Sequence, residues 1–214
     1  MARTWFVTGT DTEVGKTAIT AGLLLAAKAQ GLSTAAVKPL AAGCNENGHN
    51  EDALLLQSVM TAELDYQQVN PVALHPAIAP HIAAAKAGKN PTVSQLAGYC
   101  RAVTMGSFDF VLIEGAGGWR VPLNQRETLA ELAVALQTPV ILVVAMRLGC
   151  INHALLTAQA ILRDGLPLAA WVANSVGPKM DSYADNVQSL RERLPAPLLG
   201  EVPFLSPLDL DQLA

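Results

Sequence analysis

A series of short apolar runs rich in β-branched residues, separated by longer Ala- and Leu-rich stretches, constrains the fold of this chain most. The runs do not alternate with polar residues, which is typical of strands buried on both faces. Such strands belong to parallel sheets that are covered by helices on each side. We therefore expect an α/β fold with one doubly wound, mainly parallel sheet flanked by helices, as a single domain over residues 1–214. The expected strands are Trp5–Thr8, Thr34–Val37, Phe110–Ile113, Val140–Val144, Leu168–Ala173 and Leu198–Val202.

The stretches between these runs predict the helices, because their apolar residues recur at helical spacing. We expect an irregular segment at Tyr66–His81, which contains three prolines. The expected helices are Lys16–Gln30, Glu51–Met60, Val93–Thr104, Glu127–Gln137, Asn152–Arg163 and Asp181–Arg193.

Composition narrows the classes of function. Hydrophobic residues make up 51% of the chain and charged residues 15%, which favours a large buried core. The net charge of −4 and the lack of a basic run predict no nucleic-acid partner. No segment has the roughly 20 apolar residues of a membrane span, so we expect no membrane insertion. Three cysteines without a C-x-x-C pair, and no signal-peptide core, indicate a cytoplasmic protein without disulfides or zinc.

The run Gly9–Thr17 lies between an expected strand and an expected helix, where a phosphate-binding loop must lie. In such a P-loop, Lys16 reaches the β- and γ-phosphates and the Thr17 hydroxyl binds Mg²⁺. The usual P-loop spacing would place the first glycine at position 10, where this chain has Thr10, so Gly9 lies one position too early. The alternative is an ordinary turn with a solvated Lys16. We expect a nucleotide site and a fold like that of P-loop NTPases.

Three further charged residues are candidates for the same site, because ligands of such sheets bind outside the carboxyl ends of the strands. Glu114 follows the strand that ends at Ile113 and precedes a glycine run, which suggests a second metal ligand. Asp52 opens a helix, where an acid is equally explained by the helix dipole. Lys38 ends a strand before Pro39. Considered alone, Lys38 would be interpreted as a solvated lysine at a strand end. A second lysine facing the same site as Lys16 suggests that the two stabilise negative charge during phosphoryl transfer.

Six motifs, spread in order over almost the whole chain, resemble those of dethiobiotin synthetases. They are Gly9–Thr17, Lys38–Pro39, Glu114–Trp119, Leu148–His153, Trp171–Asn174 and Pro195–Pro203. The resemblance implies ATP- and Mg²⁺-dependent ring closure of 7,8-diaminononanoate with CO₂ to dethiobiotin, through a phosphorylated carbamate. It also implies a homodimer whose substrate site borders the partner chain.

The resemblance also assigns roles to residues. The implied catalytic residues are Lys16, Lys38 and Thr12, and the implied metal ligands are Thr17, Asp52 and Glu114. The implied nucleotide-binding residues are Glu13, Val14, Gly15, Lys16, Thr17, Ala18, Asp52, Glu114, Gly115, Ala116, Gly117, Asn174, Ser175, Pro203, Phe204 and Leu205. The implied substrate-binding residues are Lys38, Ala42, Gly118, Leu148, Gly149, Cys150, Ile151 and Asn152. In the last group the backbone N–H groups of a helix start would hold the substrate carboxylate, and Cys150 is read as a packing residue.

Two features depart from the family pattern. Ala42 stands where many relatives have serine, which removes a side-chain hydrogen bond to the substrate. Ala214 follows Phe204 closely, so we expect the last ATP-contacting segment of some relatives to be missing or altered.

Three other functions remain as alternatives. A partitioning or septum-positioning ATPase would carry a signature lysine in the P-loop where this chain has Asp11. An amidoligase acting on a corrinoid would need a glutamine-hydrolysing domain, for which 214 residues leave no room. A binding module without chemistry is disfavoured by the candidate metal ligands.

Overall fold

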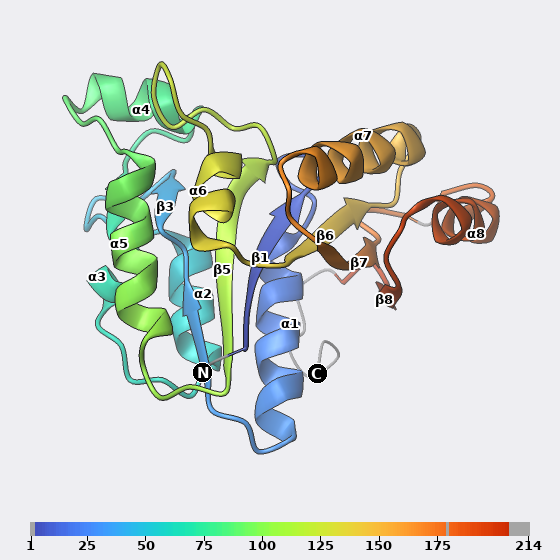
Figure 1. Ribbon diagram of the computed structural model, residues 1–214, viewed down its shortest axis with the longest axis horizontal. Coiled ribbons are helices and arrows are strands. Elements are labelled where there is room, and N and C mark those ends of the chain that lie inside the picture. The colour runs from blue at the N-terminus through green and yellow to red at the C-terminus, as the bar shows by residue number, and fades with distance from the viewer. Residues whose placement is uncertain (1–2, 179, 206–214) are drawn as a thin grey trace.

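The computed structural model describes residues 3–178 and 180–205, and its centre is a six-stranded sheet in the order β2-β5-β1-β6-β7-β8 (Figure 1). Every neighbouring pair in this sheet is parallel, so the expected mainly parallel α/β sheet is confirmed. A second sheet pairs two short strands in parallel. The strands are β1 (Arg3–Gly9), β2 (Thr34–Val37), β3 (Leu40–Ala42), β4 (Val72–Leu74), β5 (Phe110–Gly118), β6 (Val140–Ala145), β7 (Leu168–Asn174) and β8 (Leu198–Val202).

Helices flank the sheet (Figure 1), and each face of the sheet has its own core. Leu112 packs on the face covered by α1 and α2, whereas Val111 and Ile113 pack on the face covered by α5, α6 and α7. This double burial explains why the strand sequences are apolar throughout. The helices are α1 (Lys16–Ala29), α2 (Glu51–Val59), α3 (Tyr66–Val69), α4 (Pro80–Lys86), α5 (Val93–Thr104), α6 (Leu129–Leu136), α7 (Cys150–Arg163) and α8 (Tyr183–Arg193).

The expectation of an irregular segment at Tyr66–His81 was wrong. The segment contains α3 and β4, and α4 begins within it at Pro80, a residue type that is well tolerated at the first helical position. The pairing of β3 with β4 was also missed, because three-residue strands are too short to show a recognisable alternation.

Several element boundaries also differ from the expected ones. Strand β5 does not end at Ile113 but continues to Gly118, where it is still paired with β1, so that Glu114 lies within the strand. Helix α6 begins after Thr128, whose N–H donates to the carboxylate of Glu131 at 2.5 Å. Helix α7 begins two residues earlier than expected, directly after Gly149 at φ 92°. Helix α8 begins two residues later than expected.

The longest helices, α1 and α7, have 14 residues each. In the part of the chain that the structure describes, no helix combines the length and the apolar character of a membrane span. The expectation about the last ATP-contacting segment falls on residues 206–214, outside the described residues.

Candidate functional site

The P-loop connects β1 to α1 and is held against the end of β7. Gly15, the N-cap of α1, has φ +82°, and a Cβ atom there would lie 2.2 Å from the side-chain nitrogen of Asn174. Asn174, the last residue of β7, donates from Nδ2 to the carbonyl of Val14 at 2.8 Å. Glycine is therefore required at position 15 both for the backbone conformation and for the close approach of Asn174.

Lys16 is the first residue of α1 and is 7% exposed. Its Nζ donates to the backbone carbonyl of Asp11 at 3.3 Å. Burial lowers the pKa of Lys16; the nearby charge of Lys38 acts in the same direction and that of Glu114 opposes it. The ammonium group is thus desolvated and poorly compensated, so an anion such as a phosphate would be bound strongly.

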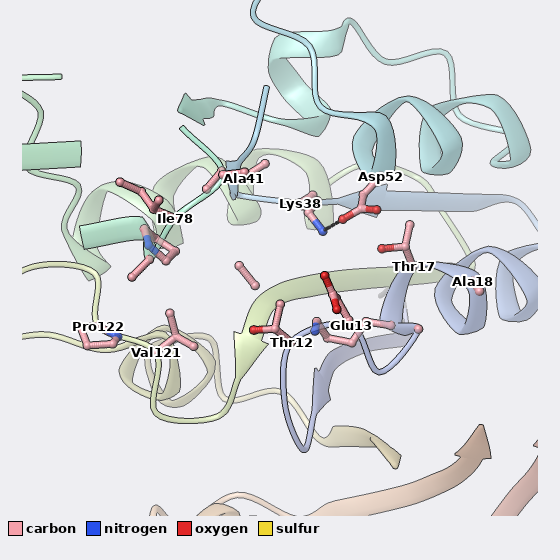
Figure 2. Close-up of a pocket in the computed structure, with 18 of the residues that line it drawn as sticks. Thr12, Glu13, Thr17, Ala18, Lys38, Ala41, Asp52, Ile78, Val121 and Pro122 are labelled. Carbon is pink, nitrogen blue, oxygen red and sulfur yellow. Dashed lines mark hydrogen bonds and ion pairs between the residues drawn. The ribbon is translucent and has the colours of Figure 1, made fainter. Parts of the chain in front are cut away.

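Lys38 lies at the centre of the site, directly after β2. Its Nζ is 2.6 Å from Oδ2 of Asp52 and 2.6 Å from Oε1 of Glu114. Figure 2 shows the bond to Asp52, with Thr17 beside it. Burial would lower the pKa of Lys38, but the two carboxylates outweigh burial and the pKa is raised. Lys38 is therefore held in its charged form at neutral pH, although it is only 4% exposed.

The oxygen atoms around Lys38 fit a divalent cation. Thr17 donates from its hydroxyl to Oε1 of Glu114 at 2.8 Å, and Glu114 is fully buried with its Oε2 lacking a hydrogen-bond partner. Lys38 lowers the pKa of Asp52 against the opposing effect of burial, which keeps that carboxyl ionised. Mg²⁺ prefers one or two carboxylates together with hydroxyl, water and phosphate oxygens. Among the described residues, no group of three or more His, Cys, Asp or Glu could bind a metal; two carboxylates and one hydroxyl are the ligands that this set offers.

A cavity of about 830 Å³ opens over these groups. Its charged end contains Lys16, Lys38 and Asp52, whereas its other end is mainly apolar, with Arg120 as its charged residue. Figure 2 shows Ala41 and Ile78 on one side of the apolar end and Val121 and Pro122 on the other. A ligand that combines a polyanion with a hydrocarbon chain would match this division.

The cavity brings together eleven of the residues that the sequence implicated, which is fewer than half of them. Its lining includes Thr12, Glu13, Gly15, Lys16, Thr17, Ala18, Lys38, Ala42, Asp52, Ala116 and Gly117. Val14 and Glu114 are fully buried, and neither they nor Gly115 are in that lining. A second cavity, of about 320 Å³, is lined by Ser175, Pro203 and Phe204 together with residues of α8 and β8, but not by Leu205.

Asn174 contributes to neither cavity, because its amide is bonded to the P-loop. A contact of Asn174 with adenine stays a prediction.

The expected substrate segment Leu148–Asn152 is not brought to the large cavity of its own chain. It forms the start of α7, where Leu148 is 95% exposed and Cys150 is buried as a packing residue. Arg147, next to this segment, forms an ion pair with Asp11 of the P-loop at 2.8 Å. Gly118 faces the P-loop instead of the cavity: a Cβ there would lie 3.6 Å from the carbonyl of Gly9.

The sequence reasoning missed the apolar wall of the cavity. Ala77, Ile78 and Pro80 come from the segment that was expected to be irregular, and Val121 and Pro122 come from the loop after β5. None of them belongs to a recognisable motif. The only available signal was their position just after the glycine run and inside the proline-rich segment.

A P-loop between the first strand and helix of a parallel sheet, with an acid on the neighbouring strand, defines the P-loop nucleotide-binding class. The family model described as "AAA domain" matches residues 3–212. Among solved structures, MinD from Aquifex aeolicus has a TM-score of 0.59 at 16% identity, covering 99% of this chain and 86% of its own. A ParA family ATPase from Chlorobium tepidum has a TM-score of 0.58 at 12% identity, covering 100% and 89%. At these identities the likeness shows the fold alone.

Curated relatives identify the family within that class. The ATP-dependent dethiobiotin synthetase of Cellvibrio japonicus is 56% identical over 207 residues, which cover 95% of this chain and 90% of the relative. The protein of the same name from Pseudomonas aeruginosa PAO1 is 57% identical, covering 94% and 90%. That of Marinobacter nauticus is 52% identical, covering 96% and 90%. The chain belongs to the dethiobiotin synthetase family.

Proposed function

We propose that this chain is an ATP-dependent ligase that converts 7,8-diaminononanoate and CO₂ to dethiobiotin, releasing ADP and phosphate. The observation that carries the proposal is the position of Lys38, 2.6 Å from both Asp52 and Glu114 at the charged end of a cavity whose other end is mainly apolar. The names of the relatives point to the same reaction.

The proposed reaction has three steps. One amine of the substrate loses a proton and adds to CO₂, which gives a carbamate. A carbamate oxygen attacks the γ-phosphorus of ATP and ADP leaves, which gives a mixed carbamic–phosphoric anhydride. The neighbouring amine then attacks the carbonyl carbon, the C–O bond to phosphate breaks, and the nitrogen loses its proton as the cyclic urea forms.

The cations of the site would act on charge that develops in these steps. Lys16 and the first N–H groups of α1 would hold the β- and γ-phosphates. Lys38 would hold the carbamate against the γ-phosphoryl group, and Thr12 lies on the same cavity. Placing a weak anionic nucleophile next to its target removes much of the entropic barrier, and fixed cations stabilise the transition state. Thr17, Asp52 and Glu114 would hold Mg²⁺, which supplies charge neutralisation on the phosphates.

The apolar end of the cavity would bind the methylene chain of the substrate. Ala41, Ile78 and Val121 offer no hydrogen bonds, so they favour hydrocarbon over water. Exclusion of water would also protect the mixed anhydride from hydrolysis. Ala42 lines this region, so the substrate would receive no side-chain hydrogen bond there.

We also propose that the chain works as a homodimer, as one domain over residues 1–214 in the cytoplasm, without nucleic-acid or membrane partners. The exposure of Leu148, together with the distance of Leu148–Asn152 from the cavity lining, supports a role for that segment in a partner's substrate site. The base of ATP would occupy the second cavity, beside Ser175 and Phe204. The cysteines Cys44, Cys100 and Cys150 are all free, as expected in a reducing compartment.

The test measures ADP release with and without the diamine, and with and without bicarbonate, with detection of dethiobiotin by mass spectrometry. The proposal requires release that depends on both co-substrates. ATP hydrolysis that ignores the diamine would instead indicate a partitioning-type ATPase. A requirement for glutamine would indicate an amidoligase.

A further inference from the structure

The backbone of Lys38 is held at both of its polar groups by the last residue of α3 and the residue that follows it. Its N–H donates to the carbonyl of Val69 at 2.8 Å, and its carbonyl accepts from Nδ2 of Asn70 at 2.7 Å. Asn70 is 2% exposed, so its amide is committed to the protein. The position of Lys38 therefore depends on the position of Asn70.

The start of α2, which carries Asp52, is held from the same place. Asn50 caps the helix by accepting from the N–H of Ala53 at 3.3 Å. The N–H of Asn50 itself donates to the hydroxyl of Tyr66 at 2.7 Å. The position of Asp52 therefore depends on the position of Tyr66.

The Tyr66 hydroxyl joins these two supports. It accepts from the N–H of Asn50 and donates to Oδ1 of Asn70 at 3.0 Å. Burial raises the pKa of Tyr66, so the hydroxyl keeps the proton that it gives to Asn70. One oxygen atom thus connects the strand end at Lys38 with the helix start at Asp52, although 14 residues separate the two in sequence.

We propose that Tyr66 is a positioning residue for the proposed ring closure, because its hydroxyl fixes the start of α2 relative to the strand end that carries Lys38. The proposal rests on the proposed function. Loss of the hydroxyl leaves the Asn50 N–H and Asn70 Oδ1 without their partner, and the two segments shift relative to each other. The reactants would then be misaligned, while the P-loop, which makes none of these contacts, would still bind ATP.

The test compares Tyr66→Phe with Tyr99→Phe. Both tyrosines line the same groove of about 700 Å³, but the Tyr99 hydroxyl only accepts from the Gln95 side chain at the surface. Tyr66→Phe keeps the ring that lies 4.2 Å from His49 between centroids, so the fold should persist. We expect kcat to fall about tenfold, with the KM for ATP changed less than about twofold, because misplacement of reactants acts on the chemical step. Tyr99→Phe should keep the wild-type kcat.

A double-mutant cycle with Lys38→Ala separates positioning from general loosening of the structure. In single-turnover assays, Tyr66→Phe should cause a smaller further loss in the Lys38→Ala background than in the wild type, because part of its effect acts through Lys38. A kcat of Tyr66→Phe within about twofold of wild type overturns the proposal, as does an undiminished loss on top of Lys38→Ala.

A second variant covers the case in which Tyr66→Phe does not fold. Asn70→Asp keeps an oxygen that accepts from Tyr66 but removes the N–H that donates to Lys38. The same loss of kcat is expected, and an unchanged kcat overturns the proposal. If the wild-type chain releases no ADP in response to the diamine, the proposed function itself has failed. If the wild type and the Tyr66 variant release ADP at equal rates, only the positioning role of Tyr66 has failed.

Discussion

The two ends of the expected ATP site are built in opposite ways. At the phosphate end, Lys38, Asp52 and Glu114 are held by ion pairs of 2.6 Å, with Lys38 and Glu114 buried and Asp52 half exposed. At the base end, the smaller cavity lies along β8, the edge strand of the sheet, and Phe204 is 50% exposed. The first region is held together by charged contacts within the protein, whereas the second offers mainly a partly open apolar surface.

This contrast follows from what each end must do. Charges that stabilise a transition state are effective only if they are already oriented, because reorienting them during the reaction would cost the energy that they supply. A purine base does not react, so a partly open apolar surface at the edge of the sheet can bind it through contact area. We therefore expect changes at the phosphate end to affect kcat and changes at the base end to affect the KM for ATP.

The largest effect is expected for Lys38→Ala. The variant should bind ATP but lose turnover by about 10²–10³-fold, since one preoriented charged donor is worth that much at a reacting centre. The measurement is diamine-dependent ADP release beside calorimetric binding of a non-hydrolysable ATP analogue. Lys28→Ala, on the exposed last turn of α1, is the matched control. Full activity of Lys38→Ala would remove Lys38 from the mechanism.

A smaller effect is expected at the junction of the two ends. Asn174→Ala removes the donor to the Val14 carbonyl and frees the P-loop from β7. The KM for ATP should rise about tenfold, which corresponds to one lost hydrogen bond with a buried, unpaired acceptor. Initial-rate kinetics check this value, with Asn47→Ala in an exposed loop as the control. An unchanged KM would show that the P-loop holds its shape without β7.

At the base end, Phe204→Ala should raise the KM for ATP about fivefold and leave kcat unchanged, as expected for loss of partly exposed stacking on a base. A competition assay would compare the affinity of the variant for ATP with its affinity for free triphosphate. A loss of affinity for ATP alone would assign the effect to the base. A drop in kcat without a change in KM would contradict the assignment of this cavity to the base.

The smallest effect within the working pH range concerns stability. The pKa of Lys38 is raised above 10.5 in the folded chain, so the folded state holds its proton more tightly than the unfolded state. The stabilisation is therefore complete below pH 10.5 and is lost as the pH rises through the folded pKa. Denaturation followed from neutral pH to above pH 10.5 should show a steeper decline in wild type than in Lys38→Met. Parallel curves for the two proteins would show that the ion pairs do not contribute.

The parts of the fold that could be predicted are those that a local pattern determines. Val140–Val144 is apolar throughout because both faces of β6 are covered, and the sequence shows this directly. The pairing of β3 with β4 depends on contact between segments about thirty residues apart, and three residues leave no pattern. The continuation of β5 to Gly118 was hidden because a glycine run also favours turns.

The candidate site likewise has a part that could be predicted from the sequence and a part that could not. The lysines and acids could be predicted because parallel strands bring their carboxyl ends to one edge. The bridge through Tyr66 and Asn70 could not be predicted, because a tyrosine beside three prolines carries no signal of its partners. The bond between Asn174 and Val14 joins residues 160 positions apart, which only the folded chain reveals.

The ion pair between Asp11 and Arg147 affects the charge at the outer rim of the P-loop. A carboxylate at the outer rim of the P-loop repels polyanions, and an arginine of the same chain neutralises it. The two side chains, each about half exposed, thus cancel one another's charge within the chain, so the rim of the loop presents neither an uncompensated anion nor an uncompensated cation to other molecules.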